Sequence, residues 1–291
     1  MGQPAGGQSA DIAGNDCPRI DCHVHIFDDR MPTCPTAWTV PDYGFSAQDL
    51  LATMERHGVG YGVISGLSIS GGYNDYMIRA LRQHRNLRGT AIVDPPADLY
   101  TLERMAEDGI VGIRLQFARM ENLPDLDSFA YRQLLRRVRD LGWHVQVAIE
   151  GPQLPLLLDP LLASGVDIVI DHFGHPDPGD RLGCAGFAAM LRAVDRGRCW
   201  VKMSGGFRLP GTAAWREDPD GDLESLAQEI AAGLIASVGT DRLLWGSDAP
   251  FVGYEKRLSY EAALASFQRW VPDPTMRREI CGTGMKLYFD Q

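Results

Sequence analysis

The sequence lacks several features that would assign it to well-known classes of protein. Acidic residues outnumber basic ones by 38 to 28, so the chain has no basic excess with which to bind a nucleic-acid backbone. None of its apolar runs is long enough to span a bilayer. The first residues, MGQPAGGQSADIAGND, have neither a basic cluster nor an apolar core, so we expect no signal peptide. These absences favour an acidic cytoplasmic enzyme that binds neither nucleic acid nor membranes.

Paired cysteine motifs are also missing. The chain contains six scattered cysteines and no C-x-x-C pair. Three disulfides would account for the even number, but free thiols packed in a core fit a reducing compartment better. With 291 residues, 45% of them hydrophobic, the chain suits one large domain or two medium ones with a substantial core.

Short apolar runs alternate with amphipathic segments along most of the chain, and the latter have helical spacing and often end in Gly. Strands that are apolar on both faces and alternate with helices predict a parallel sheet covered by helices. Eight such units predict an α/β fold, a single-domain (β/α)8 TIM barrel over residues 18–291, after a flexible tail at 1–17. A doubly wound open sheet is the alternative, but no G-x-G-x-x-G follows the first strand. The predicted strands lie within 19–27, 61–67, 88–94, 111–117, 144–149, 167–173, 199–205 and 243–249.

Polar residues cluster at the carboxyl ends of the predicted strands, where TIM barrels place their active sites. His23 and His25 end the first strand and should point to the same side of it. Asp171 and His172 lie in the sixth run, where strand alternation would turn them to opposite faces, and Asp248 ends the eighth. Each residue alone has an ordinary explanation as a core histidine or a helix cap. Their joint position predicts an active site.

Other polar residues are candidates for substrate binding. Arg114 lies inside the fourth predicted strand, where a cation needs an acid such as Glu150 or an anionic ligand. Arg208 follows the seventh strand and could equally be a solvated loop charge. Ser68 and Asn74 follow the second strand in a glycine-rich segment that could bind a ligand or form a turn.

Five segments, DCHVHIF, GIRLQF, GWHVQVAIE, VIDHFGHPD and LLWGSDAPF, resemble in order and spacing the amidohydrolase superfamily. The closer resemblance is to its branch of 2-pyrone-4,6-dicarboxylate lactonases and sugar-lactone hydrolases, and it covers nearly the whole chain after about residue 17. It implies a TIM barrel that hydrolyses the cyclic ester of a sugar acid or of a carboxylated small molecule. The expected partner is thus a small lactone or carboxylate, and a homo-oligomer is compatible with the sequence.

The resemblance also bears on metals. Metal-dependent amidohydrolases bind one or two divalent ions with H-x-H, often a carboxylated Lys, two further His and an Asp. His23, His25, His172 and Asp248 match this set, whereas Arg114 replaces the Lys and the fifth strand ends without a His. A two-metal site is therefore not expected. Our first interpretation is no metal cofactor, and the alternative is one divalent ion such as zinc on the four matching residues.

The dicarboxylate lactonases work without a metal, and the resemblance implies their mechanism. Asp248 would take a proton from the attacking water, while His172 and the first-strand pair would donate hydrogen bonds to the developing oxyanion. Arg114 and Arg208 match positions that bind substrate carboxylates in this subgroup.

The sequence also departs from the dicarboxylate enzymes at four positions. Ala148 stands for an expected Tyr, Met120 and His175 for expected Arg residues, and Phe251 for an expected His. These changes would weaken the binding of a second substrate carboxylate. They therefore favour a lactone with one carboxylate or a hydroxylated sugar lactone. His175 remains a candidate for contact with such a substrate.

Two further functions remain as alternatives. One is a zinc-dependent decarboxylase of the aminocarboxymuconate-semialdehyde type, which the missing fifth-strand His disfavours. The other is a lactone isomerase on the same barrel, because intramolecular attack on a lactone uses similar groups. A barrel that only binds a sugar acid is disfavoured, because binding alone would not need an Asp beside three His.

Overall fold

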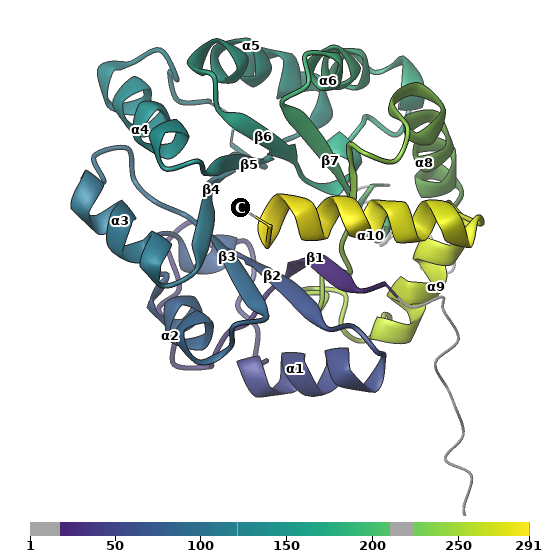
Figure 1. Ribbon diagram of the computed structural model, residues 1–291, viewed down its shortest axis with the longest axis horizontal. Helices are drawn as coiled ribbons and strands as arrows, with labels where there is room; N and C mark the ends of the chain where they lie inside the picture. The colour runs from purple at the N-terminus through teal and green to yellow at the C-terminus, as the bar shows by residue number, and fades with distance from the viewer. Residues whose placement is uncertain (1–17, 121, 210–223, 291) are drawn as a thin grey trace, which may run out of the picture.

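A ring of eight parallel strands forms the centre of the molecule in a computed structural model, which describes residues 18–120, 122–209 and 224–290 (Figure 1). Each strand pairs with the next in chain order, and a parallel bridge between Val24 and Ala249 brings the end of the ring against its beginning. The predicted TIM barrel is thus confirmed, while the predicted tail at 1–17 lies outside the described residues. The strands are β1 Ile20–Val24, β2 Tyr61–Ser65, β3 Leu87–Ala91, β4 Ile110–Gln116, β5 His144–Ala148, β6 Asp167–Ile170, β7 Cys199–Met203 and β8 Leu243–Trp245.

Helices surround this ring and cover its outer face (Figure 1). Local signals in the sequence set their ends. Ser46 and Asp49 form a capping box at the start of α1, and Gly165 adopts a left-handed backbone, with φ of 76°, where α5 ends. The helices are α1 Ala47–Arg56, α2 Asp75–Gln83, α3 Leu99–Glu107, α4 Phe129–Asp140, α5 Leu154–Ser164, α6 Ala185–Asp195, α8 Glu224–Val238, α9 Tyr260–Trp270 and α10 Pro274–Tyr288.

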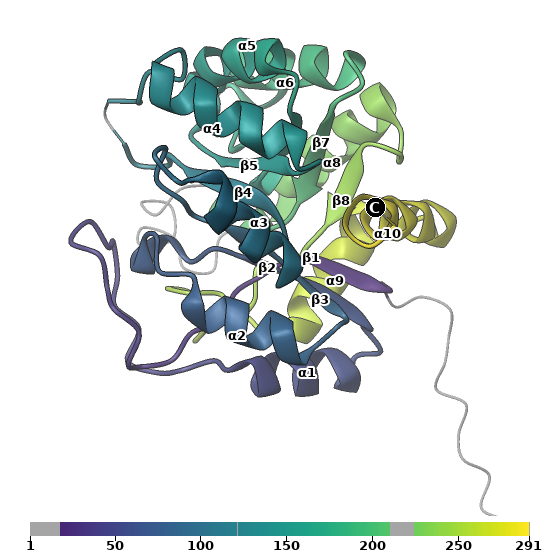
Figure 2. The same ribbon diagram turned by 60° about the vertical axis from the view of Figure 1, so that its left-hand side comes forward.

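The last helix, α10, was not predicted from the sequence. It lies across the amino-terminal end of the barrel, at the centre of Figure 1, and packs against β1 and β8. Gly284 permits this approach, because a Cβ atom there would lie 2.7 Å from Cys22 Sγ. Tyr288 is fully buried beside His144, at the start of β5, with 5.3 Å between ring centroids. The helix therefore closes the floor of the barrel, and Figure 2 shows the long segment between β1 and α1 at the opposite end.

The cysteines agree with the sequence argument as far as the structure describes them. Cys22, Cys34, Cys184, Cys199 and Cys281 are all free thiols, and four of these five are buried. Across the described ranges, no helix combines the length and the apolar character that crossing a membrane would need.

Candidate active site

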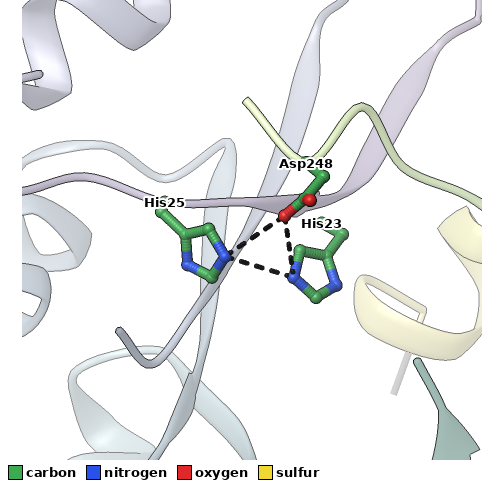
Figure 3. Close-up of side chains that lie close together, drawn as sticks. All are labelled: His23, His25 and Asp248. Carbon is green, nitrogen blue, oxygen red and sulfur yellow. Dashed lines mark hydrogen bonds and ion pairs between the residues drawn. The ribbon is translucent and has the colours of Figure 1, made fainter. Parts of the chain in front are cut away.

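The two histidines of the H-x-H motif meet at the carboxyl end of β1 (Figure 3). Their Nε2 atoms lie 3.3 Å apart. His25 Nδ1 lies 2.9 Å from the Ser65 carbonyl oxygen, which can only accept, so His25 donates from Nδ1. Burial lowers the pKa of His23 to about 3, and its Nδ1 lies 3.3 Å from an Asp171 carboxylate oxygen, the natural acceptor for its single proton. Since each Nδ1 lies beside an oxygen acceptor, both rings turn their Nε2 atoms toward the same point.

Asp248 completes this cluster from the segment that follows β8. Its Oδ1 lies 3.4 Å from His25 Nε2 and 3.6 Å from His23 Nε2 (Figure 3). This oxygen is buried, and no described residue forms a hydrogen bond with it. Its Oδ2 accepts a 2.5 Å bond from Arg208 Nε. Burial alone would raise the pKa of Asp248, but the charge of Arg208, helped by His172, holds it well below its usual range. The carboxylate is therefore ionised at neutral pH.

These three groups fit a single divalent ion by geometry. The two Nε2 atoms and Asp248 Oδ1 are separated by 3.3–3.6 Å, and a tetrahedral zinc with bonds of ~2.0–2.1 Å holds its ligand atoms about 3.3–3.4 Å apart. The unbonded Oδ1 and the partners of both Nδ1 atoms are also typical of a metal site. His172 instead groups with His23 and Asp171, so it is not placed as a fourth ligand of this set. Arg208, already bound to Asp248, would repel a cation.

Behind the cluster lies a network of buried charges centred on Asp171. Its Oδ2 accepts bonds from the Arg114 guanidinium at 3.0 and 3.1 Å and from Gln146 at 2.9 Å. Its Oδ1 lies 3.5 Å from Lys202 Nζ, which is fully buried on β7. Burial would raise the pKa of Asp171, but His23, Lys202 and Arg114 together hold it well below its usual range. Arg114 is thus paired with Asp171, and not with Glu150 as the sequence suggested.

The expectation that Asp171 and His172 face opposite sides is wrong. β6 ends at Ile170, and the backbone then turns into the left-handed region, with φ of 49° at His172 and 58° at Phe173. Strand alternation no longer applies there, so both side chains approach His23. Burial lowers the pKa of His172 to about 3, and its Nδ1 lies 2.9 Å from Ser204 Oγ. A neutral His172 whose Nδ1 accepts from this hydroxyl can donate from Nε2.

Gly205, next to Ser204, has a backbone φ of 57°. A Cβ atom there would lie 2.7 Å from His172 Nδ1 and 3.2 Å from Asp248 Oδ2. We expect Gly205→Ala to lower kcat at least about tenfold, because misplaced catalytic groups can lose about a hundredfold. Gly239→Ala is the control, since Gly239 has a similar φ of 68°, and its added Cβ would come no closer than 3.7 Å to an atom of any described residue. Equal kcat losses in both variants, measured at saturating substrate, would contradict this placement.

A cavity of about 330 Å³ opens above the cluster. Seven residues predicted for the site line it, namely His25, Ser68, Arg114, His172, His175, Arg208 and Asp248. His23 lies fully buried beneath it. Asn74 does not line it, because its amide donates to the backbone oxygens of Gly72 and Ile92, so its expected role in substrate binding is not supported.

The cavity also includes Trp38, Arg119 and Tyr254, which the sequence argument did not select, and Glu150, which it named only as a possible partner of Arg114. Arg119 matters most. The arginine expected in the loop after β4 aligned with Met120, which is exposed, whereas Arg119 lines the cavity. The resemblance placed the expected arginine one residue too far along the chain, because a single sequence does not fix the alignment of a loop.

Comparison with known proteins adds a further line of evidence. The amidohydrolase family model matches residues 20–288. A 4-sulfomuconolactone hydrolase of Rhizobium radiobacter is 27% identical over 270 residues, which cover 89% of this chain and 86% of that protein. A D-galactarolactone isomerase of Agrobacterium fabrum is 27% identical over 265 residues, with the same coverage of 89% and 86%. A solved structure described as a probable 2-pyrone-4,6-dicarboxylic acid hydrolase of Acinetobacter baumannii, with citric acid bound, has a TM-score of 0.86 and 29% identity, and the match covers 95% of this chain and all of that one.

Proposed function

The chain belongs to the amidohydrolase family, and on that basis we propose that it is a hydrolase that opens the cyclic ester of an anionic lactone. One observation carries the proposal: Asp248, with an unbonded carboxylate oxygen, meets two imidazole lone pairs at the base of a cavity that arginines also line. Lactone hydrolysis needs a base for water, a donor for the developing oxyanion and a site for the substrate. The two relatives above, by their names, also act on lactones.

The proposed reaction follows from the roles that the hydrogen bonds allow. His23, His25 and Asp248 present three acceptors to one point, so they can bind and orient a water molecule through its two hydrogens. Asp248 takes a proton as the water attacks the lactone carbonyl, and it later returns that proton to the leaving ring oxygen. His172 donates to the oxyanion. The first-strand pair thus acts as an acceptor in this scheme, rather than as the donor pair that the resemblance implied.

The same three acceptors, His23, His25 and Asp248, would hold a divalent ion. When bound, such an ion would supply Lewis-acid polarisation of the carbonyl or a lowered pKa of water. Our first interpretation remains a reaction that needs no metal, because the guanidinium of Arg208 already neutralises the Asp248 carboxylate at 2.5 Å.

An anionic substrate is supported by the arginines. Arg114, Arg119 and Arg208 all line the cavity. Of these, Arg114 binds Asp171 and Arg208 binds Asp248. Among the described residues, no acid pairs with Arg119, so its charge is available to a ligand. The relatives agree in kind, since one is named for a sulfo-substituted lactone and one was solved with citric acid.

The isomerase relative supports a second candidate function. If a hydroxyl of the substrate attacks the carbonyl in place of water, the same base and donor would move the ester to another oxygen. Hydrolysis in H2¹⁸O followed by NMR and mass spectrometry separates the two reactions. Hydrolysis places one ¹⁸O in the new carboxylate of a ring-opened product, whereas isomerisation yields an unlabelled lactone.

A panel of carboxylated, sulfonated and sugar-acid lactones, assayed before and after exhaustive chelation, tests the proposed function. We expect ring opening of at least one anionic lactone, with kcat within about twofold after chelation if the reaction needs no metal. Loss of activity that zinc restores, together with about one zinc per chain in metal analysis, would assign the ion to the three acceptors. Failure to open any lactone, or release of CO2 from an aromatic acid, would overturn the proposal.

A further inference from the structure

The Arg119 guanidinium lies at the mouth of the cavity, and no carboxylate of a described residue lies within ion-pair distance of it. Arg119 lies in the loop after β4, and within the described ranges its recorded contact is the ring of Trp38, with Arg119 Cζ 4.2 Å from the ring centroid. Burial lowers the pKa of Arg119 and the charge of Arg208 adds to this effect, whereas Glu150, which also lines the cavity, acts in the opposite direction without forming an ion pair among the described residues. Two cations therefore face the same cavity, and an anion placed between them would relieve their repulsion.

The backbone aims Arg119 in a defined direction. Its φ is 70°, in the left-handed region that an arginine rarely adopts. The turn is held by two bonds from the amides of Phe117 and Ala118 to the Ala148 carbonyl oxygen, each 2.8 Å long, and by a 3.0 Å bond from the Met120 amide to the Phe117 oxygen. A strained conformation held this firmly is typical of a functional position.

Trp38 keeps the guanidinium at the mouth. It belongs to the segment between β1 and α1, whose Cys34 amide donates to the Ile69 oxygen at 2.8 Å. The indole Nε1 donates to Ser68 Oγ at 3.4 Å, and the ring packs so closely on Gly253 that a Cβ there would lie 3.0 Å from it. Trp38 thus connects the loops after β1, β2 and β8, and it presents a fixed aromatic face to Arg119.

We propose that Trp38 is a specificity-determining residue for the lactone hydrolysis: by fixing Arg119 over the cavity, it selects substrates with an anionic group at their outer end. This inference rests on the proposed function. Trp38 is a positioning residue, because it acts through Arg119 and takes no part in proton transfer. Its effect should therefore fall on KM for charged substrates and leave kcat almost unchanged.

The test compares a carboxylated lactone with its uncharged carboxamide analogue. We expect Trp38→Leu to raise KM for the carboxylate about two- to fivefold, as a cation–π contact at a partly exposed site implies, with KM for the carboxamide unchanged. Arg119→Gln should raise the same KM at least about tenfold. Trp38→Phe, which keeps an aromatic face, should recover part of the loss. Val40→Ala, an exposed position in the same segment, is the matched control and should match the parent protein.

A double-mutant cycle and a binding measurement complete the experiment. Adding Trp38→Leu to Arg119→Gln should have no further effect, because the tryptophan acts only through the arginine. Equal effects on both lactones, or additive effects of the two substitutions, would overturn the inference. Citrate binding by calorimetry gives a readout without turnover, and we expect Trp38→Leu, but not Val40→Ala, to weaken it two- to fivefold. If no lactone is hydrolysed, the proposed function fails. The role of Trp38 is then tested by citrate binding alone, and equal affinities in all variants would overturn it.

Discussion

Replacing Asp248 by Asn is expected to lower kcat for lactone hydrolysis by between about 10²- and 10⁴-fold, the usual contribution of a general base. The amide keeps the shape of the side chain but cannot take the proton of the attacking water. It also removes the negative charge that the Arg208 guanidinium contacts at 2.5 Å. Steady-state kinetics on the lactone identified in the panel give the measurement.

Two controls separate this loss from misfolding. The thermal midpoint and citrate binding of Asp248→Asn show whether the cavity is intact. Asp98→Asn changes an exposed carboxylate that caps α3, a role that Asn fills as well, and should leave kcat unchanged. A variant that is folded and hydrolyses the lactone at the parental rate would remove Asp248 from the mechanism.

The second large effect concerns stability. We expect Asp171→Asn to lower the free energy of unfolding by about 3–5 kcal/mol at pH 7, because it leaves Arg114 and Lys202 buried without their shared carboxylate. Asp108→Asn breaks an exposed pair with Arg82 and should lower it by less than about 1 kcal/mol. Urea unfolding of both variants gives the comparison, and similar losses would show that the buried network adds little.

The pH dependence of this effect has a definite sign. The pKa of Asp171 is depressed in the folded protein, so its stabilisation is present above the unfolded value of about 3.9 and is lost as the pH falls through the folded value. The difference between the parent and Asp171→Asn should therefore stay constant from pH 8 to about pH 5 and shrink below about pH 4. A difference that grew on acidification would point to another titrating group.

The barrel could be predicted from the sequence because its strands are apolar on both faces, as in β5 and β6, and because they alternate with amphipathic helices. Helix α10 could not be predicted, because its sequence lacks a regular amphipathic pattern. Gly282 and Gly284 interrupt its pattern, although Asp273 and Pro274 give an ordinary helix start. Its apolar residues pack against the lower end of the barrel, a surface that exists only after the ring of strands has closed.

The candidate site was predicted in part. His25, His172 and Asp248 lie at strand ends, where the fold places functional groups, and all three line the cavity. The pairing of Arg114 with Asp171 depends on contacts between β4 and the end of β6, which no local pattern encodes. Arg119 stands out as the arginine that can bind a ligand only because Arg114 and Arg208 are each paired with an aspartate. Such pairing depends on the assembled site and not on any local segment.

The bridge between Val24 and Ala249 has a consequence for protein synthesis. His23 and His25 emerge from the ribosome long before Asp248, because most of the barrel lies between them in the sequence. A nascent or truncated chain that stops before β8 can neither close the ring nor assemble the three acceptors, whatever partial structure it reaches. Catalytic activity would thus serve as an assay of barrel closure, and its appearance during refolding would time the formation of contacts between segments far apart along the chain.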